Sequence, residues 1–106
     1  MEGFTAARDR LPELAKLVDE RDWTFTRNLI HGPMQEVGRE MLYINQRLLP
    51  QDRAAANKLA TSLKDAMADL DEAARLQDDA KLQKSYEDVV SGFANYSEVI
   101  PEQALS

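Results

Sequence analysis

Apolar residues recur every three or four positions along almost the whole chain. This spacing puts them on one side of an α-helix, so each stretch is expected to bury one face and expose the other. No segment alternates apolar and polar residues with period two, and no Asn-Gly or Asp-Gly pair marks a hairpin turn. The pattern therefore predicts an all-α fold.

Helix-capping residues divide this pattern into four stretches. An aspartate that can cap a helix precedes each of the last three stretches, at Asp22, at Asp52, and at Asp78 or Asp79. The helices are expected at about residues 4–20, 22–49, 52–76 and 79–100. Links of a few residues force neighbouring helices to run antiparallel. The sequence thus predicts a single domain over residues 1–106, an up-down-up-down four-helix bundle.

Two prolines lie inside the expected helices. Pro12 allows either a helix that begins near Leu11, with the proline in its first turn, or a kinked helix. We favour a loosely helical or frayed segment before Pro12 and a firm helix after it. Pro33 lacks the N–H that would bond to Leu29, yet the apolar spacing continues across it. We therefore expect one second helix, kinked at Gly32-Pro33, rather than two helices.

The composition excludes several classes of function. The chain has 106 residues with 19 acidic and 13 basic side chains, a net charge of −6, which argues against nonspecific nucleic-acid binding. It has no cysteine, so disulfides, thiol catalysis and cysteine-ligated metals are excluded. No apolar run reaches the roughly 18 residues that would span a membrane, and the first residues lack the pattern of a signal peptide.

The charge is unevenly distributed along the chain. Residues 1–22 carry a net charge of −2, residues 23–64 a net charge of +3, and residues 65–106 a net charge of −7. The middle of the chain is thus the basic part of an acidic protein. Such an asymmetry can orient docking on an acidic partner and speed association.

Few residues suggest chemistry. His31 is the only histidine, and we expect it at the surface or lining the kink, because zinc sites draw on several ligands. Adventitious metal binding by His31 or by surface carboxylates stays open. Glu36 and Glu40 lie off the apolar face and no Glu-x-x-His motif occurs, which disfavours a di-iron bundle. Without a glycine-rich phosphate loop or a Ser-His-Asp set, we expect no enzyme activity, cofactor, metal or small-molecule substrate.

One surface feature suggests a contact with another protein. Tyr43 is expected to point outward from the second helix, between Arg39 and Arg47 and near Glu36. An exposed tyrosine between arginines has the composition of an interface anchor. The alternative is an aromatic ring that lies on its own helix under arginine stems. Both interpretations stay open at this point.

Several short motifs follow one another along nearly the whole chain: Leu11-Pro12-x-Leu14, Asp22-Trp23, Arg27-Asn28, Gly32-Pro33, Leu70-Asp71-x-Ala73-Ala74, Tyr86 and Val89-Val90-Ser91. In this order they resemble the PsbQ family, the extrinsic subunits on the lumenal side of photosystem II. The Gly32-Pro33 pair and the Asn45-x-Arg47-Leu48-Leu49 sequence look like the cyanobacterial form of that family.

The resemblance implies a non-catalytic subunit that stabilises the oxygen-evolving complex and helps to retain its calcium and chloride. It implies a four-helix bundle in the thylakoid lumen, partnered by the photosystem II core and other extrinsic lumenal subunits. Cyanobacterial members of the family are anchored through an N-terminal lipidated cysteine. This chain has no cysteine, so membrane contact would need a lipid anchor that is absent from it. We expect a monomer in isolation.

The resemblance also suggests a partner for the surface around Tyr43. We hypothesise that Arg39, Tyr43 and Arg47 contact an acidic neighbour such as the manganese-stabilising extrinsic protein. Two other interpretations compete with a photosystem II subunit. One is a helical interaction or adaptor domain of another complex, and the other is a metal-carboxylate bundle with enzyme activity.

Overall fold

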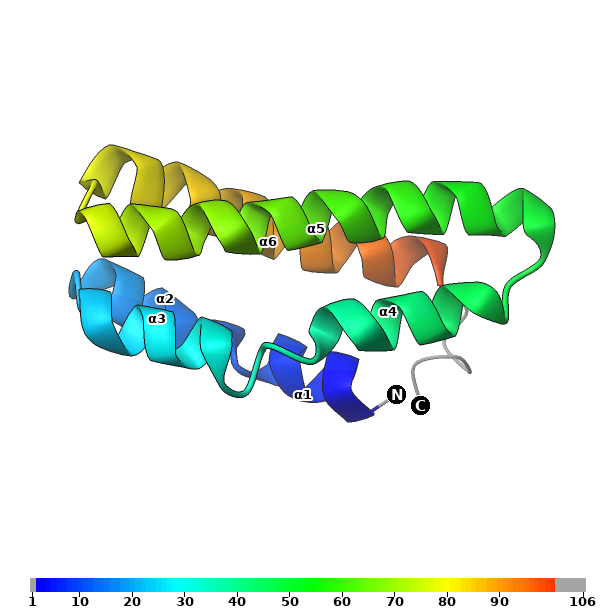
Figure 1. Ribbon diagram of the computed structural model, residues 1–106, viewed down its shortest axis with the longest axis horizontal. Helices are drawn as coiled ribbons and strands as arrows, with labels where there is room; N and C mark the ends of the chain where they lie inside the picture. The colour runs from blue at the N-terminus through cyan, green and yellow to red at the C-terminus, as the bar shows by residue number, and fades with distance from the viewer. Residues whose placement is uncertain (1, 101–106) are drawn as a thin grey trace.

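The computed structural model describes residues 2–100. These residues form a bundle of four helical segments, which we call arms. Its helices are α1 (Glu2–Asp9), α2 (Leu11–Asp19), α3 (Trp23–His31), α4 (Val37–Gln46), α5 (Pro50–Leu76) and α6 (Asp79–Val99). The first arm consists of α1 and α2, the second of α3 and α4, and the last two of α5 and α6 (Figure 1). Residues 2–100 contain no strand, and the predicted all-α bundle is confirmed.

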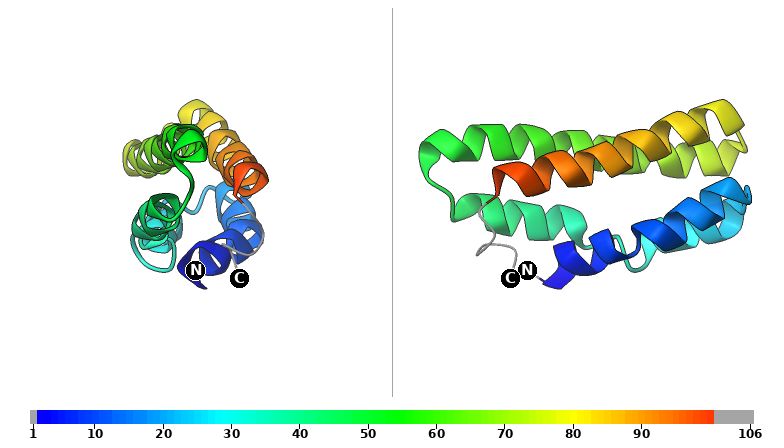
Figure 2. Two further views of the ribbon diagram at one scale, coloured as in Figure 1. Left: turned by 90° about the vertical axis from the view of Figure 1, so that its right-hand side faces the viewer. Right: turned by 180° about the vertical axis from the view of Figure 1, so that it is seen from behind.

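The arms occupy the four corners of an elongated bundle. Figure 2 shows the end view, in which α5 and α6 lie beside one another on one side and the two broken arms on the other. The second arm packs on α5, and the first arm packs on both the second arm and α6. The bundle measures 41 × 21 × 18 Å, so α5, with its 27 residues, runs its full length. Short links and antiparallel neighbours produce this topology, as predicted.

One apolar core runs the length of the bundle. Each arm contributes the residues of its own stripe, and three aromatic side chains meet where α1 packs near α6. The Phe4 ring centroid lies 5.4 Å from that of Phe93 and 5.2 Å from that of Tyr96, and all three side chains are buried. Tilted aromatic pairs at such distances add to the stabilisation that burial alone provides.

The first arm is broken at Arg10, between α1 and α2. Pro12 lies in the first turn of α2, where its missing N–H costs no hydrogen bond, as the sequence predicts. The expectation of a frayed segment before it is wrong. Phe4 and Ala7 of α1 are fully buried, because α1 packs against α4 and so gains the tertiary contacts that a short helix needs.

The second arm is also broken, and the expectation of one continuous kinked helix is wrong in that respect. The bend lies at Gly32-Pro33 as predicted, but residues 32–36 form turns that separate α3 from α4. Pro33 has no N–H to donate, and the next N–H, of Met34, bonds to the carbonyl of Leu29 at 3.2 Å, five residues back. Met34 nevertheless is fully buried. The apolar spacing therefore continues although the helix does not.

Side chains cap two of the helices. The Asp22 carboxylate accepts a hydrogen bond from the N–H of Phe25 at the start of α3, and Asp78 does the same for Lys81 in α6. Both caps agree with the prediction. The predicted cap at Asp52 is wrong, because α5 already begins at Pro50 and places Asp52 inside its first turn.

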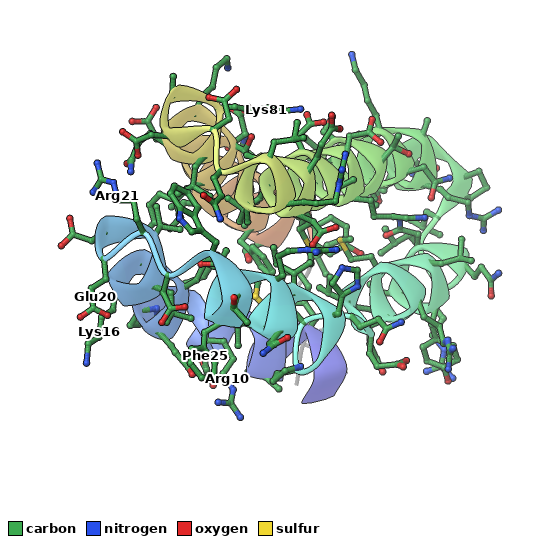
Figure 3. All side chains as sticks on the ribbon, turned by 60° about the vertical axis from the view of Figure 1, so that its left-hand side comes forward. Arg10, Lys16, Glu20, Arg21, Phe25 and Lys81 are labelled. Atoms are coloured by element: carbon green, nitrogen blue, oxygen red, sulfur yellow. The ribbon has the colours of Figure 1, made fainter. Side chains whose placement is uncertain are left out.

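Two helices end on residues in the left-handed conformation. Arg21 after α2 has φ 53° and Gln77 after α5 has φ 55°. The Arg21 side chain reaches from the α2–α3 turn to the start of α6, where its Nε lies 2.8 Å from the Asp79 carboxylate (Figure 3). This ion pair raises the pKa of Arg21 and lowers the pKa of Asp79, chiefly through their hydrogen bond. It ties the first arm to the last one.

Candidate functional site

A polar network that is buried at Tyr96 and Asn45 fixes α4 against its neighbours. The Tyr96 hydroxyl of α6 donates to the side-chain oxygen of Asn45 at 2.6 Å, and the Asn45 amide donates to Asn57 of α5 at 2.9 Å. The Tyr96 oxygen also lies 3.2 Å from the Met41 carbonyl. Because buried polar groups keep their partners, this network specifies one register of α4 relative to α5 and α6.

The register of α4 sets which residues face outward. Arg39, Tyr43 and Arg47 all lie on its exposed side, as the sequence predicts. The Arg47 guanidinium carbon lies 4.6 Å from the Tyr43 ring centroid, and Arg47 donates a hydrogen bond to the Tyr43 hydroxyl. Tyr43 is still 47% exposed. Arg39 lies apart from this pair, 81% exposed, and forms an ion pair with Glu36 at 3.3 Å.

Two exposed leucines extend this surface. Leu42 is 56% exposed and Leu49, just before α5, is 61% exposed. The sequence argument missed both. They lie seven positions apart and outside the buried stripe, and this off-phase pair was the signal that could have revealed them. Exposed apolar side chains beside an aromatic ring and arginines are typical of a protein interface. We call Arg39, Leu42, Tyr43, Arg47 and Leu49 the α4 surface.

A second feature lies between α3 and α5. A groove of about 370 Å³ is lined by Trp23, Thr24, Arg27, Asn28, His31, Ala74, Arg75 and Gln77. We call it the Trp23 groove. Next to it, the Asp71 carboxylate joins the two helices, because the same oxygen lies 3.0 Å from Arg27 Nε and 2.9 Å from His31 Nε2. The sequence argument treated these residues only as parts of separate motifs, and the fold brings them together.

His31 lies where the sequence places it, exposed at the last position of α3 and next to the bend. Within residues 2–100, no three histidine or acidic side chains are arranged to hold a metal ion. Over the same part of the chain, every helix is too short or too polar to cross a membrane.

The opposite flank of α5 is acidic. Asp65 and Asp69 of α5 and Asp88 of α6 line a shallow groove of about 420 Å³. Among the described residues, Asp88 is paired with Lys84, while Asp65 and Asp69 have no cation within ion-pair distance. Of the net charge of +3 over residues 23–64, +1 comes from residues 23–49 and +2 from residues 50–64, the first half of α5. The acidic groove therefore belongs to the second half of α5 and to α6.

Comparisons with known proteins identify the family of this chain. The model of the PsbQ family, described as oxygen evolving enhancer protein 3, matches residues 2–101. The chain therefore belongs to the PsbQ family and is an extrinsic subunit of photosystem II. It is similar to CyanoQ of Synechocystis, with 29% identity over 100 residues that cover 93% of this chain and 67% of CyanoQ. The predicted resemblance to the cyanobacterial form is confirmed.

Proposed function

We propose that this subunit docks on the lumenal face of photosystem II through the α4 surface, stabilises the oxygen-evolving complex and helps to retain its calcium and chloride. Docking would be on an acidic neighbour among the extrinsic or core subunits. The proposal goes beyond family membership, because it names the surface, the charge of the partner and the effect on the two ions.

The observation that carries the proposal is the composition and rigidity of the α4 surface. Leu42 and Leu49 are apolar and more than half exposed, and between them lies the stacked pair of Tyr43 and Arg47. A surface that is already fixed in the free protein loses little side-chain entropy on binding. The Asn45–Tyr96 hydrogen bond supplies that rigidity from beneath.

The charge pattern supports docking in one orientation. Arg39 of this surface has a side chain that is 81% exposed, and the acidic residues that line the groove between α5 and α6 lie on the other flank of the bundle. An acidic partner would attract the first side and repel the second, which favours a single pose and a faster encounter. Retention of calcium and chloride needs no ligand from this chain, because a docked subunit that covers an exit path slows the exchange of ions with water.

Reconstitution tests the proposal. Photosystem II cores stripped of extrinsic proteins would be mixed with the chain, and co-sedimentation and oxygen evolution at low calcium and chloride would be followed. We expect saturable binding that weakens as salt rises and that improves oxygen evolution. The Arg39→Glu/Arg47→Glu variant should bind roughly tenfold more weakly or worse, since it places like charges against an acidic partner.

The matched control is Lys16→Glu/Lys58→Glu, which changes the net charge equally but on exposed positions of α2 and α5. It should bind nearly as the unchanged protein does. Equal weakening by both variants would mean that only the total charge matters, and the α4 surface would lose its role. Leu42→Ser, in which the charge is unchanged, should weaken binding without altering its salt dependence.

A further inference from the structure

We propose that the Trp23 groove binds a carboxylate-rich segment of a partner protein, as a second docking point separate from the α4 surface. Every ionisable residue that lines the groove is basic: Arg27, His31 and Arg75. No carboxylate lines it, although acidic residues outnumber basic ones, 19 to 13, in the chain. The inference rests on the proposed function, since it assumes that the protein works by docking on other proteins.

The groove has more hydrogen-bond donors than its own acceptors can use. Arg27 uses Nε for Asp71 and leaves its two terminal nitrogens without a partner among residues 2–100. Over the same residues, the Arg75 side chain forms no hydrogen bond or ion pair, and the Trp23 indole N–H has no acceptor. A guanidinium has only donors, and two of its nitrogens match the two oxygens of a carboxylate. An acceptor-rich, anionic ligand would satisfy this set.

Asp71 holds two lining side chains of the groove in place and is not itself a lining residue. Its side chain is only 22% exposed, and its carboxylate holds Arg27 and His31 one helical turn apart on α3. Both side chains are therefore fixed before a ligand arrives, so binding costs less conformational entropy. The negative charge of Asp71 is offset by Arg27. Arg75, which is exposed, therefore remains as a positive charge of the groove that has no ion-pair partner within residues 2–100.

The other lining residues favour a protein segment over a single small ion. Trp23 is partly buried against the core, so its remaining surface can cover the apolar stem of a glutamate. The Asn28 and Gln77 amides and the Thr24 hydroxyl can both donate and accept, which suits the N–H and C=O groups of a peptide backbone. A volume of about 370 Å³ has room for several side chains, far more than a chloride ion would fill.

The sole tryptophan makes the test direct. Trp23 lies in the groove, and the chain has no other tryptophan, so its fluorescence reports on this site alone. The probe is a peptide of six glutamates with blocked ends, and the comparison is a peptide of six lysines. We expect a saturable fluorescence change with the glutamate peptide, weaker at higher salt, and none with the lysine peptide. A response to both peptides, or to neither, would overturn the proposal.

Substitutions at Arg75 locate the effect. Arg75→Glu should weaken the apparent affinity roughly tenfold or more, and Arg75→Gln less, because a charge-assisted hydrogen bond is lost in both and repulsion is added only in the first. The matched control is Lys58→Glu, an equal change of charge near the other end of α5, which should leave the affinity unchanged. Equal affinities of the Arg75→Glu and Lys58→Glu proteins would contradict the proposal.

Two further experiments test this inference separately from the proposed function and distinguish a protein segment from other anionic ligands. The Arg39→Glu/Arg47→Glu protein should bind the glutamate peptide normally even where it no longer docks on photosystem II cores. If instead the peptide fails to bind while the α4 variant loses docking, the groove is refuted and the α4 surface stands. A stronger fluorescence change with inorganic phosphate or with phosphatidylglycerol vesicles than with the peptide would also refute a protein segment as the ligand.

Discussion

The hydroxyl of Tyr96 in α6 lies 2.6 Å from the side-chain oxygen of Asn45 in α4, inside the core. Both side chains are almost completely buried, and 51 residues separate them in the sequence. Asn45 also donates to Asn57, so one asparagine links three arms. Hydrophobic packing alone tolerates small shifts of one helix along another, whereas this network has a single geometry. It therefore determines which side chains of α4 face outward.

Removal of the Tyr96 hydroxyl should be costly. Tyr96→Phe leaves the Asn45 oxygen buried without its donor, so we expect the free energy of unfolding to fall by about 1–3 kcal/mol. Denaturant unfolding followed by circular dichroism measures this change. Tyr86→Phe is the control, because Tyr86 is partly buried and its hydroxyl forms no hydrogen bond within the described residues. If the two variants unfold at the same denaturant concentration, the Asn45–Tyr96 bond contributes no stability.

The same tyrosine should make the protein sensitive to alkali. Burial raises the pKa of Tyr96 above that of a free tyrosine, which is about 10. At a pH below the unfolded-state pKa, the tyrosine is protonated in both states and the folded protein keeps its full stability. Above that pH the unfolded chain releases a proton that the folded chain retains, so the free energy of unfolding falls. The free energy of unfolding should therefore begin to fall at about pH 10 and go on falling until the pH reaches the raised pKa of the folded state. Tyr96→Phe should show a shallower fall than the unchanged protein, and an equal fall in both would contradict this role of Tyr96.

Two helical glycines should respond to alanine with opposite signs. A Cβ atom on Gly92 of α6 would lie 2.9 Å from Cδ1 and 3.2 Å from Cβ of the buried Leu63. Gly92→Ala should therefore lower the free energy of unfolding by about 1 kcal/mol, despite the better helix propensity of alanine. On Gly38 the nearest atoms belong to the flexible stem of Lys64, at 3.3 Å or more. Gly38→Ala should raise stability by roughly 0.5–1 kcal/mol. Thermal unfolding of both variants checks the signs.

The left-handed residues allow a second matched pair. Gln77→Gly should raise the free energy of unfolding by about 1 kcal/mol, since glycine adopts this conformation without the clash that other residues suffer. Arg21 has the same backbone strain, but its side chain pairs with Asp79 and with the carbonyl of Asp19. Arg21→Gly should therefore gain less or lose stability. A larger gain at Arg21 than at Gln77 in chemical denaturation would show that the ion pair contributes nothing.

The sequence predicts the arms well and their interruptions poorly. The apolar stripes locate four arms and their antiparallel order, because each stripe has to face the same core. At Gly32-Pro33 the same reasoning fails. Met34 lies in a turn and yet fills the core, so the spacing of apolar residues continues where the helical hydrogen bonds stop. Periodicity reports which side chains are buried, and only indirectly whether the backbone between them is helical.

The candidate sites show the same limit. The sequence predicts that Arg39, Tyr43 and Arg47 lie on one exposed face, because three- and four-residue spacing on a helix determines that. The sequence does not predict the Trp23 groove, because its walls come from helices that are distant along the chain. Trp23 and Arg75 become neighbours of one groove only when α3 packs on α5. Contacts between arms depend on the order and rotation of the arms, which periodicity leaves undetermined.

The two broken arms differ from α5 in how they would accommodate a change in chain length. One residue inserted into a continuous helix rotates everything after it by about 100°, which would turn the buried stripe of α5 toward water. The turn over residues 32–36 and the junction at Arg10 can instead take up an extra residue as a slightly larger loop. Insertions and deletions that arise during the divergence of relatives should therefore accumulate at these two points and be absent from α5.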